Sequence, residues 1–172
     1  KMSYGSPGTG TTPHLSAEYL FKVLAKTPIL HVPYKGAGPA LNGALTGEIQ
    51  FASVAMPAAV ALVKGGKLNG LAVTSVKRTS ALPDVPTVAE QGLPNYEVLF
   101  WLGLYAPKGT SPDILQLLES AIQKILAQEN VKKKLADLGM SSFFASRDDL
   151  TKQITKETAE WADVIKKAGV VL

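Results

Sequence analysis

The sequence contains no cysteine in its 172 residues. Disulfide bonds, zinc–thiolate sites and cysteine nucleophiles are therefore excluded. It has no apolar run approaching the roughly 20 residues that a helix needs to cross a bilayer. A leader with a basic start and an apolar centre is expected to precede Lys1 if the protein has one, because Lys1 is not expected to be the native start. A chain without cysteine suits a bacterial periplasm and a cytosol equally well.

Clustered positive charge is missing as well. The net charge is +4, and arginine is present only as Arg78 and Arg147. All of the excess lies in residues 1–96, which carry eight basic and four acidic side chains, whereas residues 97–172 carry ten of each. This distribution predicts no nucleic-acid partner. It suits a site for small anions better than a nucleic-acid surface, but a mildly basic, solvated surface is the more common cause of such an excess.

The residue patterns of common catalytic and metal sites are also absent. There is no Gly-x-Ser-x-Gly elbow, and the two histidines have no partner at metal-binding spacing. His31 lies in an apolar stretch, where a hydrogen-bonded core residue is expected. His14 lies in the first turn of a predicted helix, where it caps the helix, bonds a neighbouring loop or contacts a ligand. We therefore predict no catalytic residue, no metal and no cofactor.

A glycine-rich stretch near the start is the most distinctive motif that is present. Gly5 and Gly10 have the spacing of a phosphate-binding loop, and Thr12 stands where that loop has its magnesium-binding hydroxyl. Thr11 replaces the lysine, so the main charge that assists phosphoryl transfer is missing. The motif favours capture of an anion by backbone N–H groups at the start of a helix, with Thr12 as the predicted N-cap.

Strand and helix patterns alternate through residues 1–96, which predicts an α/β fold with a parallel sheet. The expected strands are 2–6, 29–34, 49–54 and 71–75, and the expected helices are 12–26, 38–45 and 58–63. Turns after three of these strands, including 34–38 and 55–57, lie where open α/β sheets bind ligands. Glycine-rich turns also occur at such places without a ligand.

The second part of the chain offers too little sheet for its helices. Residues 81–94 hold three prolines and a short predicted helix at 87–91, and they form a connector. Beyond them we expect strands at 98–106 and 142–145, and three amphipathic helices, two of which follow the caps Ser111 and Ser146 and the third of which spans 131–138. A core this small rarely holds by itself. We therefore expect the rest of this lobe to precede Lys1 or to come from another chain.

Three stretches resemble the Bug family of periplasmic solute-binding proteins, the receptors of tripartite tricarboxylate transporters. They are 31–40 (HVPYKGAGPA), 71–75 (LAVTS) and 82–90 (LPDVPTVAE), and the glycine-rich stretch at 4–14 is similar to the family's second-lobe binding loop. The resemblance implies a periplasmic-binding-protein-like fold, a type II Venus flytrap. Residues 1–96 would be one complete α/β lobe, and residues 97–172 the C-terminal part of the other, incomplete lobe. A missing N-terminal lobe segment would be supplied by the same or a separate chain.

The resemblance also implies a function: periplasmic capture of a small carboxylate for membrane transporter subunits. The ligand-binding residues carried over are Gly10, Thr11, Thr12 and His14, and more loosely Ala55 and Trp101. The only acids between Lys1 and Lys64 are Glu18 and Glu48, and neither lies on a predicted site turn. We therefore expect a ligand without an amino group: a dicarboxylate, a tricarboxylate or an aromatic carboxylate. Two alternatives stay open, an α/β enzyme acting on an acidic metabolite and a truncated fragment that binds nothing.

Overall fold

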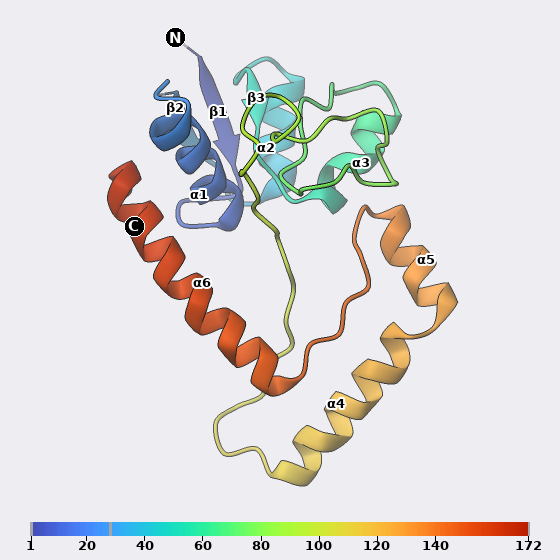
Figure 1. Cartoon of the computed structure of the whole chain (residues 1–172). Helices are drawn as coiled ribbons and strands as arrows, with labels where there is room; N and C mark the ends of the chain where they lie inside the picture. Colours follow the sequence, from blue (N-terminus) through green and yellow to red (C-terminus); the bar gives the residue numbers. More distant parts are fainter. Residues whose placement is uncertain (1, 28, 172) are drawn as a thin grey trace.

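A three-stranded parallel sheet lies at the centre of the first part of the chain (Figure 1). The computed structural model describes residues 2–27 and 29–171. Strand β1 (Ser3–Ser6) is in the middle, with β2 (Leu30–Pro33) and β3 (Phe51–Ala52) on either side. All three strands were predicted, although β3 is shorter than expected.

Four helical segments connect these strands or follow them. They are α1 (Thr12–Glu18), the π-helical continuation η1 (Tyr19–Leu24), α2 (Ala37–Leu45) and α3 (Met56–Lys64). The predicted cap of α1 is wrong by one residue. Thr11 has the extended backbone of an N-cap, and its Oγ1 accepts a hydrogen bond from the His14 N–H at 3.4 Å. Thr12 is the first helical residue.

Three predicted strands are not formed among the described residues. Residues 71–75 contribute only an isolated bridge between Val73 and Thr87, and residues 98–106 and 142–145 are irregular. An apolar stretch becomes a strand only when its backbone groups pair with a neighbour along its length. Here the pairing is confined to single points: Val73 bonds the backbone of Pro86 and Val88, and the Val98 N–H donates to the Thr74 carbonyl. The helix predicted at 87–91 is a turn, in which Thr87 and Glu90 bond reciprocally through side chains and backbone N–H groups.

The second part of the chain consists of three helices on long connections. They are α4 (Pro112–Leu126), α5 (Glu129–Asp137) and α6 (Arg147–Ala168). The predicted cap of α6 is confirmed, since Ser146 Oγ accepts the Asp149 N–H at 3.2 Å. In Figure 1, α6 returns towards the first part, and it packs against η1 and α1. The C-terminal helix thus joins the two parts.

Burial is concentrated in the first part of the chain. Of the buried apolar residues, all except Ala168 lie in residues 1–96, and one cluster of them joins α3 to residues 73–85. Large apolar side chains of the second part are more than half exposed, among them Leu99, Leu102, Leu104, Tyr105, Leu117 and Phe143. All of those named except Leu117 line a cavity of about 2350 Å³. None of the helices that the structure describes is long and apolar enough to cross a membrane.

Candidate ligand-binding site

The loop between β1 and α1 is held closed by its own hydrogen bonds. Gly8 and Gly10 take φ values of 148° and 79°, which glycine adopts without strain. The Thr11 hydroxyl donates to the Gly8 carbonyl at 2.7 Å. The Gly10 N–H donates to His14 Nδ1 at 3.0 Å. Within the described chain, the backbone N–H groups of Thr9 and Thr12 keep no protein acceptor.

The second glycine-rich turn, 34–38, braces this loop from the side. The N–H groups of Tyr34 and Gly36 donate to the carbonyls of Ser6 and Pro7 at 3.0 and 2.9 Å. The Tyr34 ring fills the space beside Gly5, where an added Cβ would come within 2.8 Å of Tyr34 Cε2. Ile49 Cδ1 would lie closer still, at 2.5 Å, so glycine is required at position 5 by the close approach of both side chains.

Two histidines lie beneath the loop. His14 is buried, with 3% of its surface exposed, and its ring stacks on that of His31 with centroids 3.9 Å apart. His31 Nε2 lies 2.7 Å from Ser6 Oγ. Burial lowers the pKa of His14, and burial together with the charge of a protonated His14 lowers the pKa of His31 to about 4. Both rings are therefore neutral at pH 7. His31 has the hydrogen-bonded role that was predicted for it.

A buried acid lies below the two histidines. Glu18 is 2% exposed, and it accepts a 2.6 Å hydrogen bond from the Tyr4 hydroxyl and pairs with Lys22. Burial, and then the Glu18 carboxylate, raise the pKa of Tyr4 far above its ordinary range. Tyr4 thus remains a neutral donor that satisfies the carboxylate.

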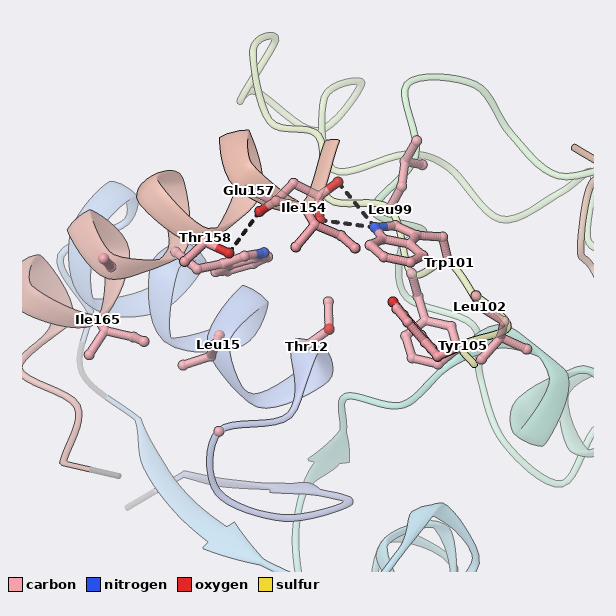
Figure 2. Close-up of a pocket in the computed structure, with 15 residues that line it drawn as sticks. Thr12, Leu15, Leu99, Trp101, Leu102, Tyr105, Ile154, Glu157, Thr158 and Ile165 are labelled. Atoms are coloured by element: carbon pink, nitrogen blue, oxygen red, sulfur yellow. Dashed lines mark hydrogen bonds between the residues drawn. The ribbon is translucent and has the colours of Figure 1, made fainter. Parts of the chain in front are cut away.

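A pocket of about 730 Å³ opens between the loop and the second part of the chain. Figure 2 shows Thr12 and Leu15 on one side, facing Trp101, Tyr105 and residues of α6 across the pocket. Its walls are mainly apolar. The Trp101 indole N–H donates to both carboxylate oxygens of Glu157, at 2.9 and 3.1 Å.

Sequence reasoning missed Glu157. It lies three residues after Ile154 and four before Trp161, so it interrupts the apolar stripe of α6. An acid within such a stripe was the signal that could have revealed it. The acids of residues 1–64 are therefore not the only ones that bear on the ligand, because the carboxylate of Glu157 lines the pocket. That carboxylate also accepts a hydrogen bond from Gln153 at 2.9 Å.

The structure separates the six predicted site residues into three groups. Gly10, Thr12 and Trp101 line the same pocket. Thr11 and His14 use their side chains to hold the loop. Ala55 lies at the start of α3 and lines the larger cavity.

The chain matches a known family along almost its whole length. The model of the tripartite tricarboxylate transporter family receptor, TctC, matches residues 1–170, and the chain belongs to this family. BugT of Bordetella pertussis is 33% identical over 172 residues, which cover 100% of this chain and 52% of that protein. A UPF0065 protein of Pseudomonas sp. strain P51 is 35% identical over 96% of this chain and 49% of its own length. The chain therefore spans about half the length of these two relatives.

Another relative has nearly the same extent as this chain. A UPF0065 protein of Pseudomonas knackmussii is 36% identical over 159 residues, which cover 92% of this chain and 94% of that protein.

Solved structures agree with the family. A protein of R. palustris solved with adipate superposes with a TM-score of 0.90 at 33% identity, over 99% of this chain and 57% of that one. The periplasmic binding protein BugD gives a TM-score of 0.84 at 31% identity, over 98% and 57%. MatC from Rhodopseudomonas palustris, solved with malate, gives 0.82 at 29% identity, over 95% and 56%. The predicted fold class is confirmed: the chain has part of the fold of a periplasmic solute-binding protein.

Proposed function

We propose that this chain belongs to a periplasmic receptor that captures a small carboxylate and delivers it to the membrane subunits of a tripartite transporter. The observation that carries the proposal is the loop at residues 5–12, which keeps free N–H donors beside an apolar pocket in a chain of the receptor family. The adipate and malate in two similar structures support a dicarboxylate.

The proposed ligand contacts are made by the loop's hydrogen-bond donors that have no acceptor within the protein. The N–H groups of Thr9 and Thr12 and the Thr12 hydroxyl bind one carboxylate, and each charged hydrogen bond contributes roughly 1.5–3 kcal/mol. The carbon chain lies against Trp101 and neighbouring apolar walls. Thr11 and His14 act indirectly, since their side chains already bond the loop. The Glu157 carboxylate disfavours additional negative charge at its end of the pocket.

The second part of the chain needs a further segment to complete the receptor. Residues 1–96 form the second lobe, and residues 97–172 form the returning part of the first. A segment of the same or a separate chain covers the exposed apolar side chains around the larger cavity and supplies the opposite side of the ligand site. The length of BugT, of which this chain spans 52%, supports this division.

Within residues 2–27 and 29–171, the pair that an enzyme could use is Ser6 and His31. Their side chains are 2.7 Å apart, as a nucleophile and its base would be. Ser6, however, is 0% exposed, so no substrate carbonyl reaches its Oγ. The low pKa of His31 also makes it a weak base. The geometry therefore favours a receptor.

A thermal-shift screen tests the proposal. The chain is heated with adipate, malate, citrate or benzoate, and with neutral adipamide as the control. A ligand at ten times its Kd stabilises the native state by about 1.4 kcal/mol, which raises the Tm of a chain of this size by roughly 3–6 °C. A rise with a carboxylate and none with adipamide is expected. Equal responses to all compounds would contradict carboxylate capture.

A further inference from the structure

The two stacked imidazoles contact the binding loop at separate points. His14 belongs to α1 and accepts the Gly10 N–H through Nδ1 at 3.0 Å. An imidazole nitrogen that accepts this bond carries no proton, so neutral His14 has its proton on Nε2. This assignment follows from the donor alone, because a backbone N–H has only one role.

His31 belongs to β2 and holds the loop through Ser6. The Ser6 hydroxyl lies 3.2 Å from both the N–H and the carbonyl of Gly8. Its oxygen accepts the Gly8 N–H, its proton is donated to the Gly8 carbonyl, and it shares a hydrogen bond with His31 Nε2, 2.7 Å away, whose direction depends on the His31 tautomer. Together the two rings fix the loop at Ser6, Gly8 and Gly10.

The surroundings set the charge of the pair. Two imidazolium ions with centroids 3.9 Å apart would repel each other strongly in a buried site. Among the described residues, the charged groups that act on the rings are Glu18 of α1, which favours a proton, and Lys22 of η1, which opposes it. The Tyr4 hydroxyl of β1 is bonded to Glu18.

Helix α6 also packs against α1 and η1. Its nearby charges, Asp163 and Lys167, bond each other at 2.6 Å and are more than half exposed. Solvent screens such a pair, so it contributes little to the charge of the buried rings.

We propose that His14 and His31 are positioning residues, a stacked pair that holds the loop in its ligand-receiving shape while both rings are neutral and releases Gly10 when His14 takes up a proton. On protonation, Nδ1 changes from an acceptor into a donor that faces the Gly10 N–H, and the bond between them is lost. The inference rests on the proposed function only in naming this loop as the binding loop.

Nitrogen-15 NMR of the imidazoles tests the pair in the ligand-free 172-residue chain. At about pH 7.5, His14 is expected to show an unprotonated Nδ1 and a protonated Nε2. As the pH is lowered, the Gly10 amide loses its hydrogen-exchange protection factor in step with protonation of His14, before global unfolding. A protonated Nδ1 at pH 7.5, or Gly10 protection that does not follow the titration, would overturn the proposal.

Matched variants separate positioning from packing. His14→Leu keeps much of the volume and removes the acceptor, whereas His14→Asn keeps an oxygen near the position of Nδ1. We expect Leu to lower the protection of the Gly10 amide by at least about fivefold and Asn to stay within about twofold of the wild type. Equal protection in both variants would refute the role. If His14→Leu does not fold, the wild-type imidazole spectrum decides. A failed carboxylate screen with an intact pair would contradict only the proposed function.

Discussion

Replacing Tyr4 by phenylalanine removes one buried hydroxyl from strand β1 and leaves the ring in place. Tyr4 is 0% exposed, and its ring packs against Phe21 and Phe51 with centroids 5.6 and 6.0 Å apart. These contacts persist in Tyr4→Phe. The Glu18 carboxylate, 2% exposed, loses its 2.6 Å donor.

The size of the effect follows from the acceptor left behind. A buried charged group that loses a hydrogen bond costs about 1.5–3 kcal/mol. We therefore expect Tyr4→Phe to lower the free energy of unfolding by about 2 kcal/mol, which corresponds to a fall in Tm of roughly 4–8 °C for a chain of this length. Urea unfolding followed by circular dichroism measures it.

A matched control and a double mutant complete this test. Tyr105 is 69% exposed, so Tyr105→Phe should change stability by less than about 0.5 kcal/mol. Glu18→Gln removes the charge that makes the bond strong, and the double mutant with Tyr4→Phe should show a coupling of at least about 1 kcal/mol. Additive effects, or a Tyr4→Phe variant as stable as the wild type, would refute the assignment of this bond as a stabilising one.

Three more predictions follow from the geometry. Folding disfavours the protonated form of His31, so the contribution of neutral His31 to the free energy of unfolding is complete above about pH 6.5 and is lost as the pH falls towards 4. Urea unfolding at a series of pH values measures this, and a free energy of unfolding that does not change between pH 6.5 and 4 would contradict it. Gly43→Ala should lower the free energy of unfolding by about 1–3 kcal/mol, because the new methyl group would clash with the Tyr34 hydroxyl. In the control Gly38→Ala the methyl group contacts no other atom, so stability should hardly change. Equal melting temperatures of the two variants would refute this. Glu157→Gln removes a negative charge from the pocket and should raise dicarboxylate affinity at least about twofold by calorimetry; an unchanged affinity would remove Glu157 from the site.

The features that sequence predicted well depend on neighbours along the chain. The Ser146 cap with Asp149, the Gly169 stop and the helices that carry apolar stripes are encoded within a few residues. Strand β1 and its glycine-rich turn were found for the same reason. The one-residue error at Thr12 arose because two adjacent threonines are equally good caps, and only the backbone conformation of Thr11 separates them.

The features that sequence did not predict depend on partners far along the chain. Residues 98–106 have the composition of a strand, yet a strand also needs a neighbour at its edge. The site shows the same limit. The stack of His14 on His31 and the contact of Trp101 with Glu157 are tertiary contacts, and no spacing rule encodes them.

Calorimetric titration of the chain with adipate, beside glutamate and adipamide, tests the central claim most directly. We expect saturable binding of adipate, weaker binding of glutamate and no binding of adipamide. In Thr12→Val the affinity for adipate should fall at least tenfold. Tenfold corresponds to about 1.4 kcal/mol of binding free energy, close to the contribution of one charged hydrogen bond. Tight binding of glutamate at neutral pH, or adipate affinity unchanged in Thr12→Val, would contradict it.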